Sequence, residues 1–185
     1  MTSISAETAR AWADVDLGAL VANARTVARI SGSRLLPMVK ANGYGLGAVA
    51  CARALEALDP WGFGVATVEE GAQLRGAGLT RPIVVFSPLQ PSQISRYAAH
   101  GLRPVIGDVD ALQAWLAQGD GPFHVEIDTG MARSGFRWQA DPSWHRPLRG
   151  APGWEGVFTH FATADSDPAM VHRQWRRFQQ VLEAL

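Results

Sequence analysis

Short apolar runs alternate with longer segments of helical period along most of the chain. The apolar runs are typical of buried β-strands, and we expect six of them, at residues 35–40, 61–67, 82–86, 102–106, 123–128 and 156–161. Between and after them the apolar positions predict helices at 47–58, 68–77, 91–99, 108–118 and 168–185, with an earlier helix at 17–30 behind a short strand at 12–15. This alternation of strand and helix predicts an α/β fold with a parallel sheet.

Three of the predicted helices have recognisable starting residues. Asp16 precedes the helix at 17–30, and Thr67 precedes a first turn that contains Glu69 and Glu70. Pro168 follows Asp167 and suits the first helical position. The stretch 138–152, rich in proline and tryptophan, is expected to be a connection with at most a short helix.

Composition narrows the class of protein. The 185 residues are 47% hydrophobic, enough for a substantial core, and the 17 basic and 17 acidic residues cancel. This balance gives no electrostatic reason to expect nucleic acid or an anionic membrane as partner. The single cysteine, Cys51, excludes an intrachain disulfide, and no apolar run approaches membrane-spanning length, so we expect a cytoplasmic protein. The histidines lack ligand-like spacing with carboxylates or cysteine, so we infer no metal.

Lys40 is the only lysine, against sixteen arginines. It ends an apolar run and is followed by a glycine-rich loop over residues 42–47. An arginine stays charged, whereas a lysine can lose its proton and condense with a carbonyl, so a lone lysine here suggests covalent chemistry. The alternative is a solvated side chain at the tip of a strand.

Three segments in order along the chain, 39–45, 127–136 and 158–165, resemble signatures of the alanine racemases, and segments 12–17 and 63–71 match as well. The resemblance implies a pyridoxal-phosphate enzyme built on a (β/α)₈ barrel with a C-terminal β domain. On this basis we expect residues 1–33 to form a strand and a helix leading into an incomplete barrel at 34–185. That barrel would end after about six strand–helix units and lack the C-terminal domain.

The same resemblance implies roles for individual residues. Lys40 would form the imine with pyridoxal phosphate and act as a proton-transfer base, and the Tyr44 hydroxyl would bind the cofactor phosphate. Arg133 would contact the phenolic oxygen of the cofactor ring and face the substrate. His160 would support, from behind, an arginine that contacts the pyridine nitrogen; that arginine has no match in this sequence.

Two positions depart from the family pattern. Glu126 stands where many members carry a carbamylated lysine that orients the equivalent of Arg133, and we predict that its carboxylate takes over this pairing. The alternative is a surface glutamate without such a role. Leu46, between Gly45 and Gly47, stands where the family usually has a histidine.

An eight-stranded barrel requires two strands beyond the sixth, and the loops that follow them commonly bind phosphate. In the family, a tyrosine of the C-terminal domain supplies the base on the opposite face of the substrate, in a head-to-tail homodimer. Neither Tyr44 nor Tyr97 matches it. We therefore expect the complete enzyme to be a homodimer, or this chain to work with a complementing chain that carries the missing half.

By resemblance, the predicted function is pyridoxal-phosphate-dependent conversion of L-alanine to D-alanine for cell-wall precursors. The sequence leaves serine or a broader set of amino acids open as substrates. Two alternatives come from other classes of protein. One is a non-catalytic module that binds pyridoxal phosphate, and the other is a fragment that docks on a full-length racemase.

Overall fold

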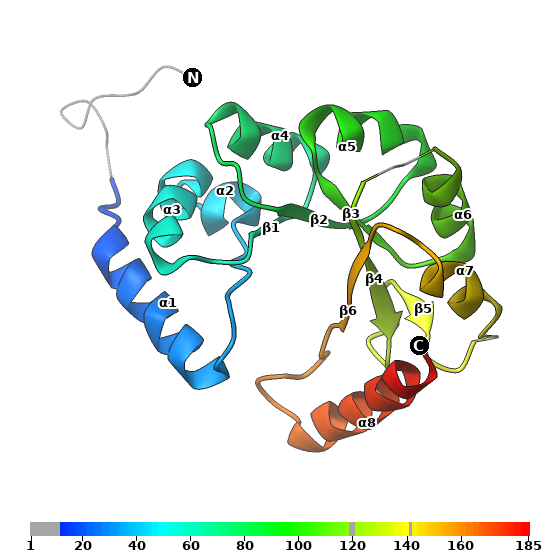
Figure 1. Cartoon of the computed structure of the whole chain (residues 1–185). Coiled ribbons are helices and arrows are strands. Elements are labelled where there is room, and N and C mark those ends of the chain that lie inside the picture. Colours follow the sequence, from blue (N-terminus) through cyan, green and yellow to red (C-terminus); the bar gives the residue numbers. More distant parts are fainter. Residues whose placement is uncertain (1–11, 119–120, 141) are drawn as a thin grey trace.

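The centre of the computed structural model, which describes residues 12–118, 121–140 and 142–185, is a six-stranded sheet in which every pairing is parallel (Figure 1). Strands β1 to β4 follow one another in space as in sequence, and β4 pairs with both β5 and β6. The strands are β1 (Phe63–Val65), β2 (Ile83–Pro88), β3 (Arg103–Ile106), β4 (Phe123–Asp128), β5 (Phe136–Arg137) and β6 (Trp154–Thr159). The predicted α/β class with a parallel sheet is confirmed.

Helices connect the successive strands except β4 and β5, which a loop joins, and α4, α5 and α6 lie along the outer side of the curved sheet (Figure 1). They are α1 (Leu17–Ser31), α2 (Lys40–Tyr44), α3 (Ala48–Leu55), α4 (Val68–Gly76), α5 (Ile94–His100), α6 (Val109–Gln118), α7 (His145–Arg149) and α8 (Pro168–Ala184), with 3₁₀ turns at Glu56–Leu58, Pro91–Gln93 and Pro142–Trp144. Each helix predicted from the sequence is present. Within the described residues, no helix is both long and apolar enough to cross a membrane.

The predicted helix starts are also confirmed. Asp16 Oδ1 accepts a hydrogen bond from the Ala19 amide at 2.9 Å. Thr67 and Glu70 form a reciprocal capping box at the start of α4, and Asp167 accepts from the Met170 amide at 3.0 Å with Pro168 in the first turn. Each cap satisfies an amide that the first helical turn leaves without a partner.

Two predicted strands, at 35–40 and 12–15, are not present as strands, and two others differ in extent: 61–67 is shortened to 63–65 and 156–161 is shifted to 154–159. Residues 35–40 run beside β1, but only Met38 and Gly64 form a bridge, because Pro37 has no amide hydrogen to donate to a ladder. Among the described residues, 12–15 form no strand, and Trp12 is 69% exposed because no described segment pairs with it.

The sequence pattern did not predict β5. A two-residue strand is too short to show a period, and its place depends on Gly135, which has φ of +106°. A Cβ atom at Gly135 would lie 2.8 Å from the Asp128 amide nitrogen, so only glycine lets the chain return this close to β4.

Apolar side chains of the strands and helices form one continuous core. Phe63, Ile83, Ile106 and Ile127 are each at most 1% exposed and come from four different strands. Burial of a large apolar side chain contributes roughly 1.5–3 kcal/mol to stability, so these positions hold the sheet and its helices together. The side chains of β6, which pairs only with β4, are mostly half-buried.

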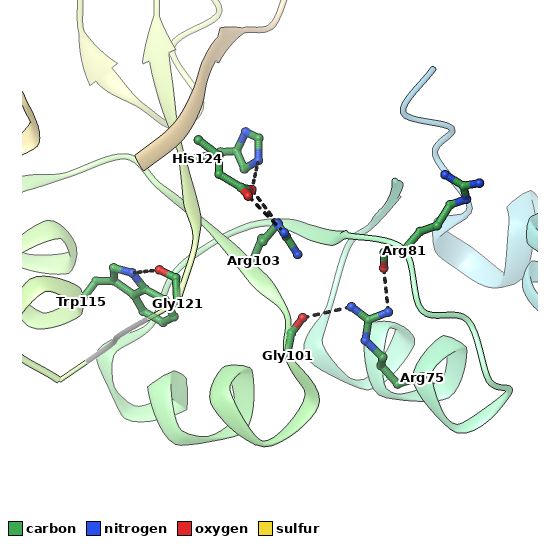
Figure 2. A network of polar contacts seen from close by, with 8 residues as sticks. Arg75, Arg81, Gly101, Arg103, Trp115, Gly121 and His124 are labelled. Atoms are coloured by element: carbon green, nitrogen blue, oxygen red, sulfur yellow. Dashed lines mark hydrogen bonds and ion pairs between the residues drawn. The ribbon is translucent and has the colours of Figure 1, made fainter. Parts of the chain in front are cut away.

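A polar cluster lies at the amino-terminal ends of the strands (Figure 2). Arg103, the first residue of β3, makes a two-pronged ion pair with Glu155 of β6, with Nε–Oε2 at 2.5 Å and Nη2–Oε1 at 3.1 Å. Trp61 packs edge-on against His124 of β4, with ring centroids 5.3 Å apart, and Arg103 stacks on the same indole at 5.6 Å. The cluster links β3, β4 and β6 at the end of the sheet opposite to Lys40.

Arg75 of α4 ties together the loops beside this cluster (Figure 2). Its guanidinium donates to the carbonyl oxygens of Leu79, Arg81, His100 and Gly101 at distances from 2.7 to 3.1 Å. One side chain thereby satisfies four backbone acceptors in the connections that precede β2 and β3.

A second polar network fastens α8 to the carboxyl ends of β4 and β6. Gln174 is fully buried, and its Nε2 donates to Thr129 Oγ1 at 3.1 Å and to the His160 carbonyl at 2.9 Å. Its Oε1 accepts from the Ala162 amide at 2.9 Å, while Thr129 and Thr159 share a hydroxyl hydrogen bond of 2.7 Å. The amide of Gln174 thus has partners on both its oxygen and its nitrogen, which is the condition under which a buried polar group stabilises a fold.

Replacing Gln174 with methionine should therefore be strongly destabilising. The change keeps the size of the side chain but removes its hydrogen bonds to the Ala162 amide, the His160 carbonyl and the Thr129 hydroxyl, at a cost of about 0.5–1.5 kcal/mol for each. We expect Tm to fall by roughly 5–15 °C for a domain of this size, measured by circular dichroism. Gln179→Met, at an exposed position on the same helix, is the control and should leave Tm nearly unchanged. A similar Tm for both variants would contradict the role assigned to the network.

Stability should also depend on the protonation of His124. Burial lowers the pKa of His124 more than the neighbouring Glu155 raises it. The unfolded chain then binds a proton more readily than the folded one, so the free energy of unfolding should fall as pH drops below about 6.5. Denaturant titrations between pH 5 and 7.5 would measure this slope. The slope should become shallower in His124→Gln and stay as it is in His172→Gln, an exposed control; equal slopes in all three chains would refute the prediction.

Candidate active site

Lys40 lies where the extended segment beside β1 turns sharply. Ala41, Asn42 and Gly43 all have left-handed backbone angles, with φ between 50° and 65°, and Tyr44 follows with φ of 56°. A left-handed residue other than glycine costs roughly 1–2 kcal/mol, so the surrounding structure must hold this turn in place.

Hydrogen bonds close the turn from within. The Gly43 amide donates to the Val39 carbonyl at 2.9 Å, and Asn42 Oδ1 accepts from the Ala48 amide at 3.0 Å, which starts helix α3. The Ala41 amide points out of the turn and donates to Glu70 Oε1 at 2.7 Å. The residue directly after Lys40 is therefore attached to another element, α4.

The Lys40 side chain lines a pocket of about 360 Å³ at the carboxyl ends of the parallel strands. Parallel strands bring their carboxyl ends to one edge, where α/β proteins commonly bind ligands. The other lining residues come from three separate segments of the chain: Ala66 after β1, Phe86, Ser87 and Pro88 on β2, and Arg133 and Ser134 in the loop after β4. An amine, a guanidinium and two hydroxyl groups thus face one cavity.

Arg133 reaches this pocket because the loop after β4 is folded back on its own strand. Asp128 Oδ1 accepts hydrogen bonds from the amides of Gly130 at 2.9 Å and Ala132 at 3.0 Å. This carboxylate stabilises the tight turn, and the close approach at Gly135 returns the chain to β4. The structure therefore brings together Lys40 and Arg133, which are 93 positions apart in the sequence.

Glu126 is 4% exposed and lies on β4, where it pairs with Phe158 of β6. Its Oε2 accepts the Ser134 hydroxyl hydrogen bond at 2.7 Å. Among the described ion pairs, none joins Glu126 to Arg133, so its direct pairing with the arginine stays a prediction. What the structure shows is a contact with the neighbour of Arg133 in the same loop.

The other two predicted site residues lie farther from the cavity surface. Tyr44 is 62% exposed, and its ring centroid is 5.9 Å from Lys40 Nζ. His160 follows β6 and is exposed, and its carbonyl is held by Gln174. Neither is among the described residues that line the Lys40 pocket.

A second pocket of about 450 Å³ adjoins the loop after β4. Asp128, Gly130, Arg137, Trp138, Gln139 and Ala140 line it. Although it is larger, its lining contains no amine that could form an imine, so the chemistry of the lining favours the Lys40 pocket as the candidate active site.

Several residues in or near the site were not predicted from the sequence. Ser87, Phe86 and Ser134 carry no motif of their own and reach the cavity only through the fold. Gln174 gave no signal because glutamine in a helix is usually a surface residue. Glu70 was recognisable, but only as an acid in the first turn of a helix.

Comparison with known proteins agrees with the site. Residues 15–185 match the family model described as alanine racemase, N-terminal domain. The chain is similar to the alanine racemase of Symbiobacterium thermophilum, at 41% identity over 94% of this chain and 48% of the relative, and to that of Nostoc sp., at 35% identity over the same shares. The crystal structure of alanine racemase from E. faecalis superposes with a TM-score of 0.84 at 33% identity, over 92% of this chain and 49% of that one.

The chain spans about half the length of these relatives. The match to the family model covers all but the first 14 residues. By sequence and by fold, the chain belongs to the alanine racemase family.

Proposed function

We propose that this chain carries the cofactor-attachment part of a pyridoxal-phosphate-dependent alanine racemase. The observation that supports it most is the shared pocket of Lys40, the only lysine, and Arg133 at the carboxyl ends of the parallel strands. Membership of the alanine racemase family supports the same reading.

The groups that line the pocket suit this cofactor. Its volume of about 360 Å³ is in the range of small-molecule sites, and it combines one amine with one fixed cation and serine hydroxyls. Lys40 would hold the cofactor covalently through its aldehyde, and Arg133 would bind an anionic oxygen of the ring. Tyr44, 5.9 Å from the amine, would contribute its hydroxyl to the phosphate. When bound, pyridoxal phosphate withdraws electrons from the carbon that loses the proton.

Racemisation requires a proton to leave one face of the substrate carbon and another to arrive on the opposite face. A neutral Lys40 Nζ can accept or return the proton on its own face. Apart from Lys40, the described lining holds an arginine, two serines and three apolar residues, none of which is an effective base near neutral pH. The second base would therefore come from outside this chain, from a homodimer partner or from a complementing chain that carries the remaining half.

The substrate we propose is alanine, exchanged between its L and D forms. Two of the three apolar pocket residues, Phe86 and Pro88, would limit the space next to the reacting carbon. Serine and other small amino acids are competitors to include in any assay of a completed enzyme.

Covalent attachment is the first experiment. After incubation with pyridoxal phosphate and borohydride, the intact mass of the chain should show an adduct that peptide mapping assigns to Lys40, in addition to any adduct at the N-terminal amine. Lys40→Arg keeps the positive charge but cannot form an imine, so its only adduct should be at the N-terminal amine. An equal adduct in both chains would overturn the proposal. A stable adduct without racemisation after addition of the missing half would favour a binding module instead.

Glu126 provides a second test. Glu126→Gln removes the negative charge that holds Ser134 at 2.7 Å and, in our proposal, orients Arg133. Loss of a charge-assisted contact predicts a Kd for pyridoxal phosphate raised by about 5- to 20-fold, measured by absorbance titration. Ser134→Ala separates the two roles: if the serine alone carries the effect, both variants should lose the same affinity. An unchanged Kd in Glu126→Gln would refute any role for this carboxylate in cofactor binding.

A further inference from the structure

The amide of Ala41, the residue directly after Lys40, bonds to a partner outside the turn. The turn closes through Val39, Gly43 and Gly45, whose bonds leave the Ala41 amide directed outward. It donates to Glu70 Oε1 at 2.7 Å, across 29 positions of sequence. A left-handed segment lacks the usual helical partner for this amide, so the carboxylate supplies it.

The same carboxylate also holds the end of β1. Glu70 Oε2 accepts from the Ala66 amide at 2.7 Å and from the Thr67 amide at 3.3 Å. Ala66 lines the pocket together with Lys40. One half-buried carboxylate therefore connects the two backbone segments that form the wall of the pocket around the amine.

Glu70 differs in this respect from its neighbour. Glu69 is also an acid in the first turn of α4, but its Oε1 pairs with Arg96 of α5 at 2.6 Å, and the pair is solvent-exposed. Both acids interact favourably with the start of the helix, where amide groups are exposed. Of these two acids, only Glu70 is bonded to the Lys40 turn. Comparing variants of Glu69 and Glu70 therefore distinguishes an effect on the start of the helix from an effect on the position of the lysine.

We propose that Glu70 is a positioning residue for Lys40: by binding the Ala41 and Ala66 amides together, it sets where the lysine amine stands in the pocket. This inference rests on the proposed function of Lys40 as the cofactor-attachment residue. Glu70 touches neither cofactor nor substrate in this account and acts only through the backbone of the turn.

The first measurement needs no cofactor. Amide hydrogen exchange of Ala41, followed by NMR on the ¹⁵N-labelled chain, should be about 10-fold faster or more in Glu70→Gln, because the amide side chain loses the charge and sets an NH₂ group against one of the donors. Glu69→Gln should match the wild-type chain at Ala41. Thr67→Ala breaks the capping box but leaves the Ala41 bond, so it should change this exchange by no more than about 2-fold.

The second measurement is the reactivity of the Lys40 amine. Trapping of pyridoxal phosphate at Lys40 by borohydride should be about 10- to 100-fold slower in Glu70→Gln, because a misplaced group loses most of the benefit of proximity. Reductive methylation of Lys40 by formaldehyde, which needs no pocket, should stay within about 2-fold of the wild-type rate, which would show that the amine itself remains accessible and reactive.

These outcomes separate the two proposals. If the wild-type chain takes up no pyridoxal phosphate at Lys40, the proposed function fails, and the exchange of Ala41 still decides whether Glu70 holds the turn. If the wild-type chain takes it up and Glu70→Gln behaves like Glu69→Gln, the positioning role is wrong. Equal losses in Glu70→Gln and Thr67→Ala would also overturn it, because Glu70 would then act only through the start of α4.

Discussion

Parallel pairing of the strands is the interaction on which the candidate site depends. Because β1, β2, β4 and the segment bridged to β1 at Met38 all run in one direction, the residues that follow them emerge at one edge, and residues as distant as Lys40 and Arg133 face one cavity. Strand β4 is the central strand of this arrangement, since it pairs with β3, β5 and β6. The opposite ends of β3, β4 and β6 are joined by the cluster of Arg103, His124 and Glu155, so the sheet is held at both ends.

The sequence predicted the elements well where a period or a cap expresses a local preference. Asp16, Thr67 and Asp167 start the helices that their side chains predict, because an N-cap acts within one turn of chain. The short strand β5 was not predictable, because it exists only through the close approach of Gly135 to β4. Likewise the segment before Lys40 is extended but forms a single bridge, since pairing depends on the donors of both neighbours and Pro37 has none.

In the candidate site too, some residues were predictable from the sequence and others were placed only by the fold. Lys40 and Arg133 stand out by residue type and motif, and the fold places both in one pocket. The groups that hold their loops, Glu70 on the Lys40 side and Asp128 with Ser134 on the Arg133 side, act through bonds to backbone or to one carboxylate. Such contacts depend on atoms brought together by tertiary structure, and residue types alone do not reveal them. Gln174 is the clearest case: a glutamine on a helix becomes, once buried, the connection between α8, β4 and β6.

The lone lysine has one more consequence. A protease that cleaves only after lysine has a single target bond in the whole chain, the one between Lys40 and Ala41. The nitrogen of that bond is the atom that Glu70 holds, within a left-handed turn that does not fit the extended conformation proteases require. The fraction of chains left uncut at this bond during digestion would thus report how much of the protein has the Lys40 turn folded.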